Sequence, residues 1–267
     1  MALAVRYKLL ALDLDGTILD LHLNLDPRDL EALHRIVAAG VTVIACTGRP
    51  FPGAVPWVEK LGLKGPVVCY QGAQVRNLDG QLLLDHGVPH ALAMEVIQFA
   101  RDRNLHVQAY RDDQLIVERD RPEAHRYAEH ASMQIHLVHD LDSAMGLTTP
   151  KLVIVSTPEV LESILPEARA RWKGRLNVAT STPDYLEFTS ADSDKASALR
   201  FLSERLGITQ AEVVAVGDGR NDASMIAWAG LGVAIEGSAP EVVAAADRTI
   251  APPGHGGIDR LADALLT

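Results

Sequence analysis

Short apolar runs alternate with amphipathic segments over the first part of the chain. Residues 8–12, 41–45 and 66–70 are mostly apolar, which is typical of strands buried on both faces of a sheet. Between the first two runs, apolar residues recur at helical spacing after Pro27, and a shorter helix is expected before the third run. This strand–helix–strand order predicts a doubly wound parallel sheet. Such a sheet binds its ligands outside the carboxyl ends of its strands.

The pattern changes after the third run. The sequence Asn-Leu-Asp-Gly at 77–80 lies between apolar flanks and predicts a hairpin, and amphipathic helices then alternate with short strand-like segments. Near residue 194 the strand–helix alternation resumes and continues to the end of the chain. We therefore expect an α/β fold with two parts. A Rossmann-like, doubly wound parallel sheet core is expected from residues 1–82 and 187–267, and an inserted α/β domain, with an antiparallel sheet and helices, from residues 83–186.

Composition and charge limit the classes of partner. The 267 residues carry a formal net charge of -10, which argues against nucleic acid as a partner. No apolar run reaches the ~18 residues that a membrane span needs, and the N-terminus lacks the basic and apolar regions of a signal peptide. Cys46 and Cys69 both lie in strand-like runs, so we expect buried free thiols. These features predict a cytoplasmic protein without a membrane partner.

The first apolar run ends in Asp13-Leu14-Asp15-Gly16-Thr17. Asp13 and Asp15 are two residues apart and therefore point to the same side of an extended chain. Like charges held that close repel each other unless a cation or a shared proton relieves them. Gly16 allows a sharp turn that brings backbone N–H groups close to a ligand. The sequence thus predicts a site for a metal ion and an anion at the tip of a central strand.

Three further polar clusters occur later in the chain. Thr47 follows the second run, Lys195 opens a helix, and a later strand is followed by Asp218, Asn221 and Asp222. Each cluster alone has a plain structural explanation as a turn, a helix cap or a solvated lysine. Because three of the four clusters follow parallel strands, their joint occurrence favours one shared site.

Phosphoryl transfer is the chemistry that this set of side chains suits. A carboxylate can act as nucleophile and form an aspartyl-phosphate. The second carboxyl, Asp15, can protonate the leaving oxygen and then deprotonate the attacking water. Mg²⁺ binds carboxylate, phosphate and water oxygens and neutralises charge on both nucleophile and phosphate. Lys195 adds a positive charge, and Thr47 adds a neutral hydroxyl donor.

These clusters resemble the four motifs of the haloacid dehalogenase superfamily. The matching residues are Asp13-Leu14-Asp15-Gly16-Thr17, Thr47-Gly48-Arg49, Lys195 and Gly217-Asp218-Gly219-Arg220-Asn221-Asp222. The insert lies between the second and third motifs, which resembles the Cof-type subfamily with a C2B cap. The resemblance therefore implies that residues 83–186 form a cap domain.

The resemblance also implies a role for each motif residue. Asp13 would be the nucleophile and a Mg²⁺ ligand, and Asp15 the general acid/base with its backbone carbonyl on the metal. Asp218 would bind Mg²⁺ directly, and Asp222 would support the metal shell or orient Lys195. The implied phosphate contacts are Gly16, Thr47, Gly48, Lys195 and Asn221.

The expected function is Mg²⁺-dependent hydrolysis of small phosphorylated metabolites, such as a sugar phosphate, through an aspartyl-phosphate. A phosphomutase with the same intermediate is one alternative, and a non-catalytic, receiver-like module that stays phosphorylated is another. Asp15 argues against the second, because a proton-transferring carboxyl beside the nucleophile should hasten hydrolysis. Gln71 stands where many relatives carry Asn, and Ala196 where Gly is common, which concerns substrate preference. The sequence specifies neither the substrate nor the oligomeric state, monomer or dimer.

Overall fold

The computed structural model describes residues 6–266. Contacts between residues divide the chain into two compact units. The core unit comprises Met1–Gly48, Ala54–Leu83 and Asp194–Thr267, and the inserted unit comprises Arg49–Gly53 and Leu84–Ser193. A parallel sheet, antiparallel sheets and helices together confirm the expected α/β fold class.

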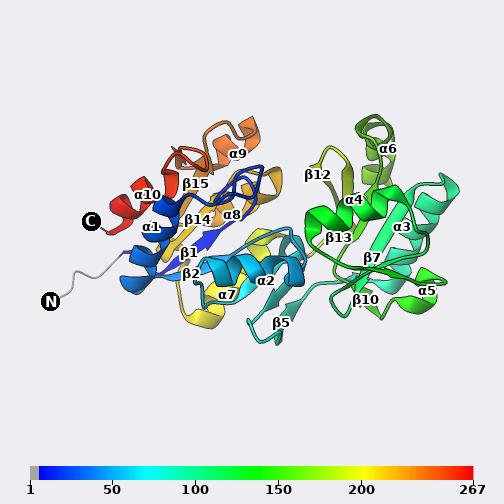
Figure 1. The fold of residues 1–267 in the computed structure, drawn as a ribbon, viewed down its shortest axis with the longest axis horizontal. Helices are drawn as coiled ribbons and strands as arrows, with labels where there is room; N and C mark the ends of the chain where they lie inside the picture. The colour runs from blue at the N-terminus through cyan, green and yellow to red at the C-terminus, as the bar shows by residue number, and fades with distance from the viewer. Residues whose placement is uncertain (1–5, 267) are drawn as a thin grey trace. The chain divides into compact units, whose positions relative to one another are not determined.

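A five-stranded parallel sheet in the order β16-β15-β14-β1-β2 forms the centre of the core unit (Figure 1). β1 pairs with β14 on one side and with β2 on the other, and all four of its residues are fully buried. This position explains why the sequence of β1 is an uninterrupted apolar run instead of an alternating one. The strands are β1 (Leu9–Leu12), β2 (Thr42–Ala45), β14 (Val213–Gly217), β15 (Leu231–Ile235) and β16 (Arg248–Ile250).

Amphipathic helices pack against this sheet. The side chain of Asp26 accepts a hydrogen bond from the N–H of Arg28, and with Pro27 in the first turn it starts α1 as expected. α1 packs beside α10, and α8 packs between α7 and α9. The helices that carry core-unit residues are α1 (Pro27–Ala38), α2 (Phe51–Lys60), α7 (Lys195–Leu206), α8 (Ala223–Trp228), α9 (Pro240–Ala245) and α10 (Gly257–Leu266).

The third predicted strand is not a full member of the parallel sheet. β3 (Val67–Cys69) meets the end of β2 only at the isolated parallel bridge between Cys46 and Val68. The chain then turns sharply at η1 (Tyr70–Gly72), so that β3 pairs antiparallel with β4 (Gln74–Arg76). β5 (Leu82–Asp85) completes this three-stranded sheet, and the turn between β4 and β5 is the predicted hairpin.

The inserted unit contains a six-stranded sheet in the order β12-β13-β11-β7-β8-β9. Its pairs are antiparallel except for β8 with β9, which run parallel because α4 connects them. β13 crosses the boundary between residues 186 and 187 that was expected from the sequence. The strands are β7 (His106–Arg111), β8 (Gln114–Val117), β9 (Ile135–Leu137), β11 (Leu152–Val155), β12 (Leu176–Thr182) and β13 (Tyr185–Ser190), with the short pair β6 (Val88–Pro89) and β10 (Thr148–Thr149) beside them.

The two faces of this sheet differ in polarity. On one face, the rings of Phe99 and Phe188 meet Trp172 edge to face, at centroid distances of 5.2 and 5.3 Å. On the other face, Lys151 and Glu187 form a buried ion pair, with Nζ 2.8 Å from Oε1. The helices of the unit are α3 (His90–Asp102), α4 (Pro122–Ala131), α5 (Leu141–Ala144) and α6 (Pro158–Arg171).

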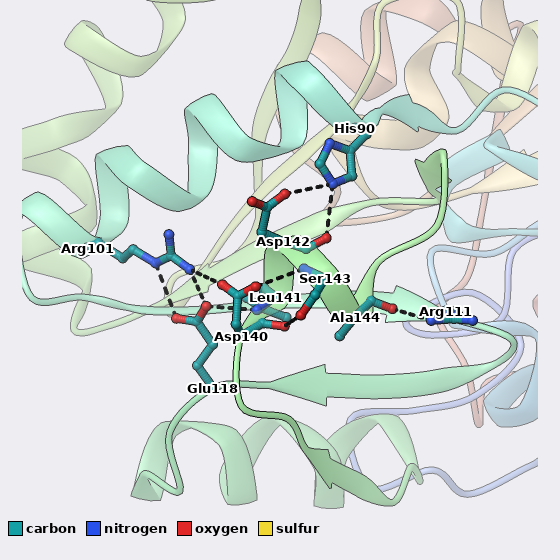
Figure 2. A network of polar contacts seen from close by, with 9 residues as sticks. All are labelled: His90, Arg101, Arg111, Glu118, Asp140, Leu141, Asp142, Ser143 and Ala144. Carbon is teal, nitrogen blue, oxygen red and sulfur yellow. Dashed lines mark hydrogen bonds and ion pairs between the residues drawn. The ribbon is translucent and has the colours of Figure 1, made fainter.

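A polar network fixes the short helix α5 within the inserted unit (Figure 2). The guanidinium of Arg101 on α3 binds Glu118 and also lies 3.2 Å from Asp140, the residue that caps α5. At the other end of α5, the guanidinium of Arg111 donates a 2.7 Å hydrogen bond to the carbonyl of Ala144. Both ends of a helix too short to be stable alone are therefore held by charged groups.

Both cysteines are buried free thiols, as expected. Within residues 6–266, no helix is both long enough and apolar enough to cross a bilayer.

Candidate active site

The carboxyl ends of three neighbouring parallel strands meet at one edge of the core sheet. Asp13 follows β1, Thr47 follows β2 after Cys46, and Asp218 follows β14. The backbone N–H of Asp13 donates to the carbonyl of Val216 at 3.0 Å, so the β1–β14 ladder continues up to the first carboxylate. The topology thus brings together side chains that lie up to about two hundred positions apart in the sequence.

Lys195 lies at the start of α7, which begins with a capping box between Asp194 and Ser197. Its ammonium Nζ is 2.6 Å from Oδ1 of Asp13 and also binds Oδ1 of Asp222. Burial alone would lower the pKa of Lys195, but the carboxylates of Asp13 and Asp222 outweigh burial and raise that pKa above its usual value. The buried lysine therefore keeps its positive charge.

Asp222 accepts hydrogen bonds through both carboxylate oxygens. Oδ1 binds Lys195, and Oδ2 accepts from the backbone N–H groups of Asp218 at 3.0 Å and Gly219 at 2.8 Å. A Cβ at Gly217 would lie 2.4 Å from the Cβ of Asp222, so only glycine leaves room for this arrangement. These contacts fix Asp222 as a bridge between Lys195 and the loop that carries Asp218.

Three carboxylates converge beside the lysine. One ligand oxygen from each of Asp13, Asp218 and Asp222 lies within 4.8 Å of the other two. Burial raises the pKa of Asp13 well above its usual value, and the carboxylate of Asp222 adds to this effect while Lys195 opposes it. Burial likewise raises the pKa of Asp218 to about 6, although the hydrogen bond from Thr17 acts in the opposite direction.

The oxygen donors of this cluster fit a hard divalent cation such as Mg²⁺. Lys195 donates a hydrogen bond to Oδ1 of Asp13, and the hydroxyl of Thr17 donates a 2.7 Å hydrogen bond to Oδ1 of Asp218. In the part of the chain that the structure describes, the Oδ2 atoms of these two carboxylates are therefore the better ligands. Asp222 fits less well as a direct ligand, because an ammonium and two N–H groups already surround it.

The remaining predicted residues lie around this centre. Asp15 is half-buried and is not a member of the three-carboxylate cluster. Gly16 has φ +83°, and a Cβ there would lie 2.3 Å from Oδ2 of Asp218. Thr47 is buried, and its N–H donates to the carbonyl of Val68. The side chain of Gln71 positions Asn221, because Nδ2 of Asn221 donates a 2.7 Å hydrogen bond to Oε1 of Gln71. No role was predicted for Gln71 from the motifs.

Sequence reasoning missed the contacts of two residues. The sequence marks Thr17 only as part of the first motif, but its hydroxyl holds Asp218. It marks Gln71 only as a departure from Asn, but the Gln71 side chain lies against both Asn221 and Gly48. The departure from Asn was the one signal for Gln71, and it did not indicate these partners.

A cavity of about 350 Å³ adjoins this edge of the core sheet. Gly16 and Asp218 line it together with Glu236, Ser238 and His255 from loops after β15 and β16. His255 thus lines the same cavity as the carboxylate of Asp218.

Known protein families and solved structures resemble this chain over nearly its whole length. A family model described as haloacid dehalogenase-like hydrolase matches residues 10–261. The chain is 30% identical over 247 residues to YxeH of Bacillus subtilis (strain 168), to which a phosphatase activity is ascribed, with 90% of this chain and 92% of that protein covered. It is also 30% identical over 238 residues to the HMP-PP phosphatase of Serratia proteamaculans (strain 568), covering 88% of this chain and 86% of that protein. Among solved structures, a haloacid dehalogenase-like hydrolase from Bacteroides thetaiotaomicron superposes with a TM-score of 0.88 at 30% identity, covering 97% of this chain and 99% of that one.

Proposed function

The chain belongs to the family of haloacid dehalogenase-like hydrolases and is a phosphomonoester hydrolase, and on this premise we propose that it is a Mg²⁺-dependent phosphatase of small phosphorylated metabolites. The observation that supports the proposal most strongly is the buried ion pair between Lys195 and Asp13, with Asp218 beside it. This arrangement orients a carboxylate by an ammonium and places it next to a candidate cation site, which is what a nucleophile for phosphorus requires.

The reaction consists of two phosphoryl transfers, and Asp15 transfers one proton in each. A carboxylate oxygen of Asp13 attacks phosphorus, the bond from phosphorus to the leaving oxygen breaks, and Asp15 donates a proton to that oxygen. Asp15 then takes a proton from water as the water oxygen attacks the aspartyl-phosphate. The bond between phosphorus and Asp13 breaks, and inorganic phosphate and the free carboxylate result.

Asp13 and Asp218 would hold Mg²⁺ through their side chains, and Asp15 through its backbone carbonyl. Bound there, the ion would neutralise charge on the nucleophile and on the transferred phosphoryl group. Asp222 would support the metal site without binding the ion itself, because its oxygens already accept hydrogen bonds from Lys195 and two backbone N–H groups. Its role is to hold Lys195 and the loop of Asp218 in place.

Neutral donors and one ammonium would bind the phosphoryl oxygens. Thr47, Lys195 and Asn221 contribute side chains, and Gly16 and Gly48 contribute backbone N–H groups. Such donors stabilise negative charge that spreads over the oxygens in the transition state. We further propose that residues 83–186 act as a cap, which would exclude bulk water and contact the leaving group.

The relatives support the proposed substrate class. HMP-PP phosphatases are among these relatives, so HMP-PP belongs in the first panel beside sugar phosphates and other phosphomonoesters. Phosphate release is measured with Mg²⁺ and with EDTA for the wild type and for Asp13→Asn. Asp79→Asn is the matched control, because it makes the same change on the exposed hairpin of the core unit.

The proposal expects release that needs Mg²⁺, is lost in Asp13→Asn and is retained in Asp79→Asn. Acid quenching during turnover should trap a phosphorylated Asp13. Full activity in Asp13→Asn would exclude Asp13 as nucleophile. Return of the phosphoryl group to substrate instead of water would favour the mutase alternative, and a phosphoprotein stable for hours would favour the receiver-like module.

A further inference from the structure

The turn at η1 has an unusual backbone for its sequence. Tyr70 has φ +53° and Gln71 has φ +61°, and both are ordinary L-residues in a region that glycine favours. Gly72 continues the left-handed run with φ +90°. A strained turn of this kind persists only where the surrounding structure holds it, and such turns cluster at functional sites.

The Gln71 side chain lies between two motif loops of the core unit. Its Oε1 accepts a 2.7 Å hydrogen bond from Nδ2 of Asn221, while its backbone N–H donates to the carbonyl of Thr47 at 3.2 Å. A Cβ built on Gly48 would lie 2.4 Å from Nε2 of Gln71, so the amide rests directly on the backbone of Gly48. One side chain therefore touches the loops that carry Thr47, Gly48 and Asn221.

The glycine that follows fixes the turn against the third motif. A Cβ at Gly72 would lie 2.2 Å from the carbonyl oxygen of Asp194, the residue that precedes Lys195. The turn is thus wedged against the start of α7 on one side and the second motif on the other. This close packing holds Gln71 in its left-handed conformation and leaves its amide little freedom to move.

The contact to Gln71 determines which way the amide of Asn221 faces. A Cβ at Gly219 would lie 2.3 Å from Oδ1 of Asn221, which places that oxygen toward Gly219 and the NH₂ group toward Gln71. An NH₂ group has two hydrogens, so one can bind Gln71 while the other binds a ligand. An acceptor at Gln71 thus keeps the donor end of Asn221 on this side.

We propose that Gln71 is a positioning residue that orients the amide of Asn221 and supports the Gly48 backbone for binding of the phosphoryl oxygens. The inference rests on the proposed function in that Asn221 and Gly48 contact phosphate. Gln71 acts through these two groups. Its side chain spans the gap between the second and fourth motifs.

The test uses Gln71→Met, which keeps the length of the side chain but removes its amide. We expect KM for a phosphomonoester and Ki for inorganic phosphate to rise together by about tenfold, because one oriented hydrogen bond to a charged oxygen is weakened in ground and transition state alike. The change in kcat should stay within about threefold. Gln74→Met is the matched control, because Gln74 is also a hydrogen-bonded glutamine of the core unit but lies outside the site.

A double variant separates positioning from an independent contribution. Asn221→Ala combined with Gln71→Met should lose less phosphate affinity than the product of the two single losses, since Gln71 acts in part through Asn221. Gln71→Gly removes the strained side chain as well as the amide, so it should weaken phosphate binding equally while the melting temperature stays the same or rises.

Each outcome decides the inference. An unchanged Ki for phosphate in Gln71→Met, or multiplicative losses in the double variant, would overturn it while leaving the proposed function intact. Parallel loss of melting temperature and kcat in Gln71→Gly would indicate a purely structural turn. If the wild type hydrolysed no phosphomonoester, the proposed function would fail by itself; the side-chain amide signal of Asn221 in ¹⁵N NMR spectra would then still show whether Gln71→Met releases that amide.

Discussion

Two substitutions that each remove one negative charge from the same cluster should have opposite effects on stability. Asp13→Asn should stabilise the metal-free protein, and Asp222→Asn should destabilise it. Asp13 has one hydrogen-bonded cation, Lys195, and two carboxylates within 4.8 Å. Asp222 has the same lysine but also two backbone N–H donors, at 3.0 and 2.8 Å.

The magnitude follows from these distances. At an effective dielectric constant of about 20, two unit charges within 4.8 Å of each other repel by at least about 3.5 kcal/mol, so Asp218 and Asp222 together oppose the charge on Asp13 by at least about 7 kcal/mol. The attraction to Lys195 at 2.6 Å is about 6 kcal/mol on the same scale. Burial of the carboxylate costs several kcal/mol more. The charge on Asp13 is therefore a net cost, on the order of 2–4 kcal/mol, in the absence of metal.

The assay is thermal unfolding of both variants in EDTA and in Mg²⁺ at neutral pH. One kcal/mol corresponds to about 2–4 °C for a chain of this size, so Asp13→Asn should melt about 5–10 °C above wild type in EDTA. Asp222→Asn should melt lower by a similar amount, because the loss of a buried ion-pair partner costs about 3–5 kcal/mol. In Mg²⁺ the melting temperature of Asp13→Asn should exceed that of the wild type by less than in EDTA, because the wild type would bind the ion with one more carboxylate.

The pH dependence has a defined sign. The folded-state pKa of Asp13 is raised, so its ionised form destabilises the metal-free fold above the unfolded pKa, and protonation removes that cost as the pH falls through the folded value. The difference in melting temperature between Asp13→Asn and wild type should therefore disappear in acid. A variant Asp13→Asn that melts below wild type in EDTA would refute the reasoning, because the attraction of Lys195 would then outweigh burial and repulsion.

Three further substitutions or conditions test other parts of the structure. Burial raises the pKa of Asp218 to about 6 and also raises that of Asp13, and a protonated carboxyl cannot bind metal. The Mg²⁺ concentration for half-maximal activity should therefore rise at least about tenfold per pH unit below about pH 6. A titration that gives the same value at pH 5 and 7.5 would contradict this. Gly16→Ala should lower kcat/KM about 100-fold or more in Mg²⁺, because its Cβ would lie 2.3 Å from an oxygen of Asp218, and steady-state kinetics measure the loss. In the inserted unit, Lys151→Met should cost about 3–5 kcal/mol, because it removes the ammonium that balances the buried carboxylate of Glu187. Calorimetry should show most of that loss recovered in Lys151→Met/Glu187→Leu.

The centre of the core sheet could be predicted from sequence because β1 and β14 are short, wholly apolar and followed by polar clusters. In a parallel sheet that pattern fixes both the burial of β1 and the edge at which Asp13, Thr47 and Asp218 meet. The ion pair between Lys195 and Asp13 joins residues 182 positions apart, and only the family motifs related them in advance. Local periodicity carries no information on such a contact.

Strand partners and the η1 turn could not be predicted in the same way. β3 has the apolar sequence of a parallel strand, but the chain reverses immediately after it and gives it an antiparallel partner. That reversal uses positive φ angles at Tyr70 and Gln71, two residue types that signal no turn. The parallel pairing of β8 with β9 depends on where α4 returns the chain. The sequences of these strands would suit a parallel or an antiparallel partner equally well, so they do not indicate the direction of pairing.

The charges of the site favour neutral donors, in addition to Lys195, at the proposed phosphate position. Asp13, Asp218, Asp222 and Lys195 together carry two negative charges, which a divalent cation would balance. A phosphomonoester then brings about two more negative charges into a buried region, where the hydroxyl of Thr47 and the amide of Asn221 can bind its oxygens without repelling the cation. Without the cation, phosphate would meet uncompensated carboxylates. The proposed binding of both ligands here predicts that their affinities are coupled, so that each ligand would raise the affinity of the other by the same factor.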